Sequence, residues 1–160
     1  MVKFHLKRLN TPATWPLARK ENVFITRPNP GYKREMCLPI NNVLKNVLGK
    51  TQTTKESKFI LTHQEVLVNG KRRKDYRYPV GFLSVLSLTA AKEHYRLTVN
   101  NKGKLVFKAE KPTLSTTIPQ KLVGKTSLKK GIVQLNFFDG SNLRCDEKSY
   151  KVNDTLLIQE

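Results

Sequence analysis

Basic side chains are the residues of this chain whose type and spacing could do chemistry, and that chemistry is the binding of polyanions. The densest group is Lys71–Lys74 (KRRK) together with Arg77, here called the hairpin cluster. It directly follows Asn69-Gly70, a dipeptide typical of a two-residue hairpin turn. Because side chains alternate along a strand, four consecutive cations cannot all face one way. We therefore expect a protruding knob that contacts phosphates on two sides, as in the recognition of structured RNA. The alternatives are a solvated surface run and a nuclear-import signal.

Net positive charge is spread over the whole chain. Its 160 residues include 30 Lys and Arg against 12 Asp and Glu, a formal net charge of +18. Residues 1–36, 37–88 and 89–160 each carry an excess of six cations. Repulsion among Lys and Arg side chains spread over the whole chain is offset when a polyanion binds. Binding is favoured further because each neutralised phosphate releases its condensed counterions. Nucleic acid is therefore the expected partner. A merely basic protein without such a partner is the alternative.

Residues that commonly catalyse reactions form no recognisable constellation. The histidines His5, His63 and His94 are scattered, without the spacing of metal ligands. The sequence contains no phosphate-binding loop, dinucleotide fingerprint or nucleophile elbow. Cys37 and Cys145 lie far apart and belong to no ligand pattern, so we expect two free thiols in a reducing compartment, the cytoplasm. These features favour a binding protein over an enzyme, with no metal and no cofactor.

Length and hydrophobicity set the remaining bounds. A chain of 160 residues with 38% hydrophobic side chains has room for one or two small domains. No apolar run approaches the roughly 20 residues that span a bilayer. The first ten residues, MVKFHLKRLN, lack the apolar centre of a secretory signal. We therefore expect no membrane partner.

Residues 38–88 predict a compact α+β unit. Two segments place apolar residues at helical spacing, and the second opens with a T-x-x-E capping box formed by Thr53 and Glu56. Strand-forming residues follow, with the Asn69-Gly70 turn between them. The predicted elements are a helix over 39–48, a helix over 53–63, a hairpin over 66–76 and a strand over 83–88.

The two flanking segments have different patterns. Residues 89–160 predict short strands at regular spacing, typical of a small barrel or curled sheet. The expected strands cover 97–99, 105–107, 121–123, 132–138, 143–144 and 152–158. Residues 1–37 predict an irregular, extended basic arm, because four prolines interrupt any regular element. Trp15 and Phe24 are expected to pin this arm to the protein, while its composition predicts no order before RNA binds.

Basic and aromatic side chains alternate within the arm, a mixture that suits phosphate contact and base stacking. The candidate RNA-binding residues of the arm are Lys3, His5, Lys7, Arg8, Arg27, Tyr32, Lys33 and Arg34. Those of the hairpin cluster are Lys71, Arg72, Arg73, Lys74 and Arg77.

Eight short motifs occur in a specific order along the full chain. They are HLKRL at 5–9 with Trp15 after it, RPNPG at 27–31, CLP at 37–39, VNGKRRKD at 68–75, YPVGF at 78–82, YRL at 95–97, QLNFFDGSN at 134–142 and KVNDT at 151–155. Each motif alone is weak. In this order and at these spacings, the chain resembles the small-subunit ribosomal protein family S4e of archaea and the eukaryotic cytoplasm.

The resemblance implies an S4-type RNA-binding domain over residues 38–88, between the arm at 1–37 and a β-rich central domain at 89–160. The helices and hairpin of such a domain present the RNA surface, which adds Lys45, Lys50, Lys55 and Lys58 as candidate contacts. The resemblance implies a structural constituent of the small ribosomal subunit that binds and stabilises folded ribosomal RNA beside neighbouring ribosomal proteins. It also implies a cytoplasmic protein that is neither an enzyme nor a homo-oligomer.

Two features depart from the family pattern. The family normally continues beyond KVNDT into a small β-barrel module of the KOW type, whereas this sequence ends at Glu160. The missing module is explained either by a natural shortening of the protein or by a truncation of the sequence. Leu83 and Ser84 stand where the family often has a Met-Asp pair. The alternative function is that of a free-standing RNA-binding factor: an RNA chaperone, a ribosome-rescue factor or the targeting module of an RNA-modifying enzyme.

Overall fold

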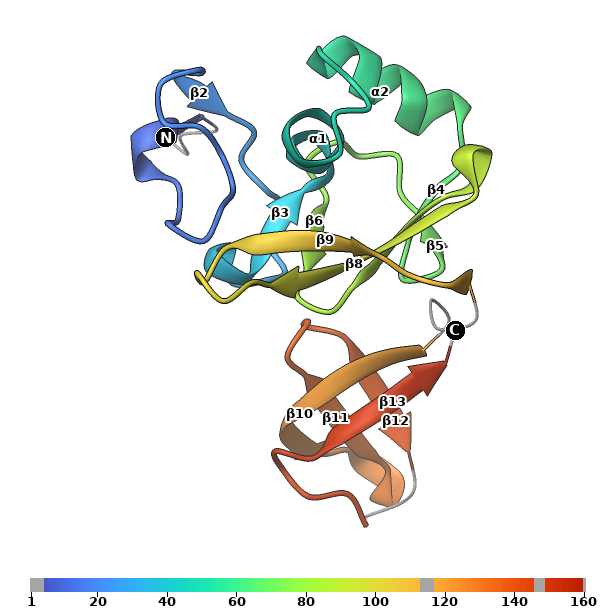
Figure 1. The fold of residues 1–160 in the computed structure, drawn as a ribbon. Helices are drawn as coiled ribbons and strands as arrows, with labels where there is room; N and C mark the ends of the chain where they lie inside the picture. Colours follow the sequence, from blue (N-terminus) through green and yellow to red (C-terminus); the bar gives the residue numbers. More distant parts are fainter. Residues whose placement is uncertain (1–4, 113–116, 146–148, 160) are drawn as a thin grey trace. The chain divides into compact units, whose positions relative to one another are not determined.

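The chain folds into two compact units, residues 1–116 and residues 117–160 (Figure 1). The computed structural model describes residues 5–112, 117–145 and 149–159. Within these residues, the first unit combines short helices with antiparallel strands, and the second is formed mainly of strands. The predicted α+β class is confirmed.

The first unit is built on a five-stranded antiparallel sheet in the order β5-β4-β7-β8-β9. Its strands are β4 (Val66–Val68), β5 (Lys71–Arg72), β7 (Val85–Leu88), β8 (Glu93–Val99) and β9 (Leu105–Ala109). A single 3-10 turn, η4 (Thr89–Ala91), joins β7 to β8, and these two strands pair directly. The sheet therefore continues across residues 88 and 89, and the division between the two compact units falls between residues 116 and 117. The domain bounds expected from the sequence stay a prediction.

Helix α2 (Thr54–His63) lies on one side of this sheet, as Figure 1 shows. The Thr53 side chain accepts a hydrogen bond from the Glu56 backbone N–H, and the Glu56 carboxylate accepts one from the Thr53 N–H. The predicted capping box is therefore confirmed, and it satisfies donors that a helix start leaves free. Leu61 of α2 is fully buried and joins Leu86 of β7 in the main hydrophobic core.

The first predicted helix forms in two pieces. α1 (Ile40–Asn42) continues directly into a π-helical segment, η3 (Val43–Val47). Gly49 follows with a φ of +63°, a left-handed conformation that glycine adopts without steric cost and that ends the helix. A two-stranded sheet of β3 (Cys37–Pro39) and β6 (Pro79–Gly81) leads into α1 and is absent from the sequence-based expectations.

The described part of the arm, residues 5–37, contains short regular elements within an otherwise irregular path. Strands β1 (Leu6–Lys7) and β2 (Phe24–Ile25) pair, and single 3-10 turns occur at η1 (Arg8–Asn10) and η2 (Arg34–Met36). Trp15 is fully buried in the main core, so its expected role in pinning the arm is confirmed. The same expectation is wrong for Phe24, whose side chain is 59% exposed and lies edge-on to the His5 ring.

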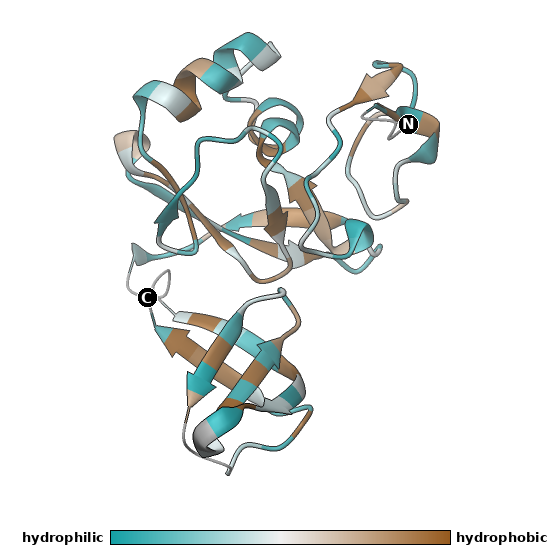
Figure 2. Cartoon of the chain, turned by 180° about the vertical axis from the view of Figure 1, so that it is seen from behind, coloured by the Kyte–Doolittle hydropathy of each residue, from teal (hydrophilic) through white to brown (hydrophobic). Residues whose placement is uncertain are grey.

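The second unit is a four-stranded antiparallel sheet in the order β12-β11-β10-β13. Its strands are β10 (Thr117–Ser127), β11 (Val133–Phe137), β12 (Asn142–Cys145) and β13 (Thr155–Gln159), with a 3-10 turn η5 at Lys129–Gly131. β10 pairs with β13 over its first half and with β11 over its second half, as in a strongly bent sheet. Hydrophobic and polar residues alternate along these strands (Figure 2), and Leu122, Leu135 and Phe137 form their core.

Candidate nucleic-acid interface

The hairpin cluster begins in a tight turn that the sequence dictates. Asn69 and Gly70 both have positive φ angles, 51° and 70°, as a type I′ hairpin turn requires. Lys71 and Arg72 then pair with β4 as strand β5, and both side chains are exposed. Lys74 is also exposed. The turn therefore presents three cations of the cluster to solvent at the edge of the five-stranded sheet.

Arg73 differs from its neighbours in the cluster. Its guanidinium lies over the Tyr78 ring, 4.3 Å from the ring centroid, and its side chain is partly buried. Its backbone N–H donates to the Val66 oxygen at 3.0 Å. A guanidinium stacked in this way stabilises the loop after β5 by a cation–π contact. The knob expected from four cations is thus built from Lys71, Arg72 and Lys74, with Arg73 turned back onto the protein.

Helix α2 exposes two of the predicted lysines, Lys55 and Lys58. The Lys58 ammonium lies 4.5 Å from the centroid of the Tyr76 ring, so α2 and the loop after the hairpin present their charge together. At the helix start, hydrogen bonds from the Gln52 backbone N–H and then from the Thr53 hydroxyl lower the pKa of Glu56 below its ordinary value. This carboxylate is therefore engaged in capping the helix.

The other two predicted lysines lie near the first helix. Lys45 is partly buried within η3, and Lys50 follows Gly49 with its side chain exposed. The Lys50 ammonium pairs with the Glu93 carboxylate at 2.9 Å. This hydrogen bond raises the pKa of Lys50 and lowers that of Glu93. Lys50 therefore lies in a local ion pair, which weakens its field toward a distant phosphate.

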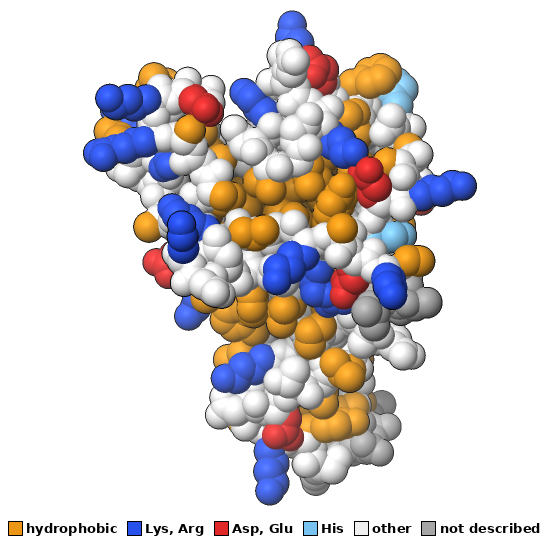
Figure 3. Space-filling view, in the orientation of Figure 1, with side chains coloured by type: hydrophobic (Ala, Val, Ile, Leu, Met, Phe, Trp, Pro, Cys, Tyr) orange, Lys and Arg blue, Asp and Glu red, His pale blue; other side chains and the backbone are white. Residues whose placement is uncertain are grey.

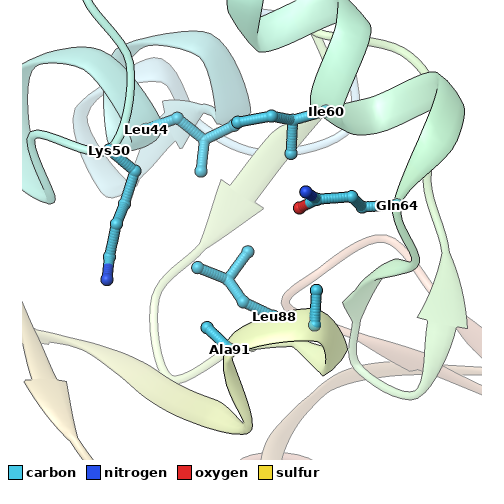
Figure 4. Close-up of a pocket in the computed structure, with 7 residues that line it drawn as sticks. Leu44, Lys50, Ile60, Gln64, Leu88 and Ala91 are labelled. Carbon is cyan, nitrogen blue, oxygen red and sulfur yellow. The ribbon is translucent and has the colours of Figure 1, made fainter.

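A largely apolar hollow of about 270 Å³ lies beside Lys50, between α2 and the segment after β7 (Figure 4). Leu44, Ile60 and Leu88 line it, and Gln64 extends its amide toward it. Figure 3 shows hydrophobic side chains gathered between α2 and the sheet on the same face, whereas Lys and Arg are spread around them. On this face, the positive charge therefore surrounds an apolar surface rather than forming one block.

The first residues of the arm serve mixed roles. His5 and Lys7 are exposed, and Lys3 lies outside the described residues. The Arg8 guanidinium donates to the Ala18 oxygen at 3.0 Å, to the Thr11 hydroxyl at 2.5 Å and to the Leu17 oxygen. Arg8 therefore closes the loop that carries Trp15, a structural role that the sequence does not distinguish from RNA contact.

Four predicted residues meet in one cleft, here called the arginine cleft. Its volume is about 520 Å³. It is lined by Arg27, Pro28, Asn29, Pro30, Tyr32, Arg34 and Arg77. The arm thus contributes two guanidinium groups and an aromatic ring, and the hairpin cluster contributes a third guanidinium. Lys33, also in this part of the arm, is exposed and does not line the cleft.

Asp75 joins the two walls of the arginine cleft. Its carboxylate accepts hydrogen bonds from the Asn29 side-chain amide at 2.6 Å and from the Arg77 backbone N–H at 2.8 Å. The Asn29 N–H donates to the Arg77 backbone oxygen at 2.9 Å, and the Arg77 Nε donates to the Arg27 oxygen at 3.3 Å. These bonds hold the arm against the loop after the hairpin. Sequence reasoning missed this junction, because its partners are separated by 46 residues.

A second hollow adjoins the arginine cleft. Its volume is about 370 Å³, and its lining includes the aromatic side chains of Phe24 and Tyr76. Arg27 and Arg77 line both cavities. Tyr76 and Phe24 are not among the RNA-binding residues expected from sequence, although the Tyr76-Arg77 dipeptide, aromatic beside cationic, is a signal of the right type.

The described residues contain neither a metal-binding cluster nor a membrane-spanning helix. In that part of the chain, no group of three or more His, Cys, Asp or Glu side chains lies close enough together to hold a metal ion. None of its helices has the length and apolar character needed to cross a membrane. Neither cysteine forms a disulfide bond: Cys37 is buried and Cys145 is partly exposed.

Comparison with known proteins gives matches along most of the chain. Residues 91–159 match the Ribosomal family S4e, and residues 2–31 match the RS4NT (NUC023) domain. The chain is 39% identical over 155 residues to the small ribosomal subunit protein eS4 of Methanosphaera stadtmanae. It is 37% identical over 166 residues to the protein of the same name from Methanocaldococcus jannaschii. The aligned regions cover 96% and 98% of this chain.

A solved structure shares this architecture. The crystal structure of the 30S ribosomal protein S4e from Thermoplasma acidophilum superposes with a TM-score of 0.60 at 28% identity, covering 78% of this chain and 62% of that one. The chain spans 64% of the length of the Methanosphaera protein and 67% of the Methanocaldococcus protein. It therefore corresponds to about two thirds of each relative.

Proposed function

The chain belongs to the ribosomal S4e family, and from this membership we propose that it is a structural constituent of the small ribosomal subunit. In this role it binds and stabilises folded small-subunit ribosomal RNA, and it contacts neighbouring proteins of the subunit in the cytoplasm. It does so without catalysis, by screening phosphate repulsion and fixing the geometry of RNA helices.

The observation that carries the proposal is the joint surface of α2 and the β4–β5 hairpin. Lys55, Lys58, Lys71, Arg72 and Lys74 are exposed on these adjoining elements. Such a surface suits recognition by shape and charge, because phosphates lie on both sides of an A-form groove. The segment 38–88 is accordingly proposed as the S4-type RNA-binding domain, flanked by the arm and by the strand-rich remainder.

The remaining predicted residues add positive charge that is available to RNA outside this surface. His5, Lys7, Lys33 and Arg34 are exposed along the arm, and a net charge of +18 favours association with any folded RNA. Lys50 and Arg8 carry less of the proposed contact, since the first pairs with Glu93 and the second closes a loop of the arm.

The proposal is tested by sedimentation of the natively expressed, tagged protein through a sucrose gradient. A stoichiometric peak with the small ribosomal subunit that survives a high-salt wash is the expected result. Migration as a free protein, or release at modest salt, would overturn the structural role. It would indicate instead a transient RNA-binding factor such as a chaperone or rescue protein.

A further inference from the structure

We propose that the arginine cleft is a preformed site for one unstacked nucleotide of RNA, with its base on Tyr32 and its phosphate beside Arg27 and Arg77. This inference rests on the proposed RNA-binding function and adds the state of the RNA that the protein recognises. The joint surface of α2 and the β4–β5 hairpin suits a double-stranded RNA helix. The cleft, in contrast, suits a nucleotide that has left the stack.

Tyr32 has one ring face covered and its position fixed. A Cβ atom added at Gly81 would lie 1.9 Å from Cε1 of Tyr32 and 2.2 Å from its Cζ, so the ring packs directly on the glycine backbone. The Tyr32 hydroxyl and the Ser84 hydroxyl share a hydrogen bond of 3.2 Å. The ring also lines the cleft. Because its orientation is set before RNA arrives, a base that stacks there meets little entropic cost from ordering the tyrosine.

The cations of the cleft are placed for a phosphate next to that base. Arg27 and Arg77 line both the arginine cleft and the adjoining hollow, so we take them as the ridge that an RNA backbone would cross between the two cavities. A phosphodiester that crosses this ridge lies beside both guanidinium groups, while the base on one side of it enters the cleft. Arg34 adds a third cation to the wall. Guanidinium groups are suited to this task, because their donors match phosphate oxygens in pairs.

Size and rigidity of the cleft favour a nucleotide over a helix. About 520 Å³ is within the range of cavities that hold small ligands, whereas a paired helix keeps its base faces covered by stacking. The Asp75 bonds to Asn29 and Arg77 keep the two walls together. Stacking on one aromatic side chain is tolerant of base identity. The site therefore selects unstacked RNA without selecting a sequence.

The test compares two RNA hairpins that differ only in the bases of a short 3′ overhang. One overhang carries uridines, and the other carries abasic nucleotides with the same phosphates. Fluorescence anisotropy with the full chain measures both affinities at one salt concentration. We expect the uridine probe to bind about tenfold more tightly, since stacking of one base on an aromatic ring strengthens binding by about that factor. Equal affinity of the unsubstituted chain for both probes would overturn the inference.

Variants assign the preference to the cleft. Y32L removes the ring and should abolish the preference for uridines while retaining affinity for the abasic probe. Y32F keeps the ring and should keep the preference. G81A leaves Tyr32 in the sequence but displaces its ring, so it should act as Y32L does; thermal unfolding followed by circular dichroism establishes that each variant folds. A preference that persists in folded Y32L would also overturn the inference.

K33A is the matched control, because it removes a neighbouring cation that does not line the cleft. It should lower affinity for both probes by the same factor and leave their ratio unchanged. Failure of the proposed function has a different signature: the chain would bind neither hairpin, or would migrate apart from small subunits in the gradient. Equal and tight binding of both probes overturns the nucleotide site alone.

Discussion

The indole Nε1 of Trp15 donates a hydrogen bond to the backbone oxygen of Arg34 at 3.0 Å. This bond joins the loop near the start of the arm to the residues that lead into β3. Next to Trp15, the Thr14 backbone oxygen accepts from the N–H of Leu105, the first residue of β9, at 2.8 Å. The arm is therefore attached both to itself and to the five-stranded sheet, and the buried indole is the centre of that attachment.

Removing the indole should destabilise the first unit strongly. Trp15 is fully buried, and truncation of a buried aromatic side chain typically costs about 3–5 kcal/mol. We expect W15A to lower the free energy of unfolding by that amount. The measurement is a urea titration followed by far-UV circular dichroism, a signal that does not depend on the tryptophan. W15F retains much of the buried ring and loses the hydrogen bond to Arg34, so its loss should be clearly smaller. Equal stability of W15A and the unsubstituted chain would contradict this account of the arm.

Local signals in the sequence predicted α2 and the β4–β5 hairpin, and long-range pairing explains most of what they missed. A capping box and an Asn-Gly turn each depend on only three or four consecutive residues. The roles of Thr53 and Asn69 can therefore be predicted from the local sequence alone. The pairing of β3 with β6 and the bond between Asn29 and Asp75 join segments that no local pattern connects. The arginine cleft depends on that junction. Its residues were therefore predicted singly, as cations and an aromatic ring, but not as one site.

The charge of a side chain also does not reveal its contacts. Arg73 and Lys74 are adjacent in the sequence and equally basic, yet the first packs on Tyr78 and the second is exposed. The difference follows from the direction of each residue after β5, which the tertiary structure sets. Phe24 shows the reverse case, since an apolar type predicted burial and the short β1–β2 pairing leaves it exposed.

Loss of the helix cap should produce a modest, measurable destabilisation. T53A removes the hydroxyl that accepts from the Glu56 N–H at 3.3 Å, and loss of such a cap typically costs about 1 kcal/mol. T62A is the matched control, because Thr62 lies on the exposed face within the same helix. Differential scanning calorimetry should show a lower Tm for T53A than for T62A. The reverse order would contradict the capping role.

Acid should weaken the same cap through Glu56. Hydrogen bonds from Gln52 and Thr53 lower the pKa of Glu56 below 4.5, so its stabilising contribution is present above about that pH and declines as the pH falls through the folded-state pKa. The Tm difference between the unsubstituted chain and E56Q should therefore be largest near neutral pH and shrink toward pH ~3. A difference that grows with acidification would show that the carboxylate is not stabilised by these bonds.

The two thiols should differ in reactivity. Burial raises the pKa of Cys37 to about 11, an effect that the charge of Arg34 opposes only in part. The reactive thiolate is therefore scarce near pH 8, and the sulfur is enclosed. Iodoacetamide should label the partly exposed Cys145 in the native chain and label Cys37 only after denaturation. Peptide mass spectrometry reads both sites, and rapid native labelling of Cys37 would contradict its burial.

The exposed cations of the hairpin cluster should account for part of the salt dependence of RNA binding. Each phosphate contact contributes about 0.7–0.9 to the slope of log affinity against log salt. We expect the triple variant K71A/R72A/K74A to reduce that slope by up to about 2–3 on a small-subunit RNA fragment, with Arg73 kept because it packs on Tyr78. K121A/K129A/K151A removes the same charge from exposed positions of the second unit and should change the slope less. If the two triple variants reduce the slope equally, the hairpin has no privileged contact with phosphates and acts only through net charge.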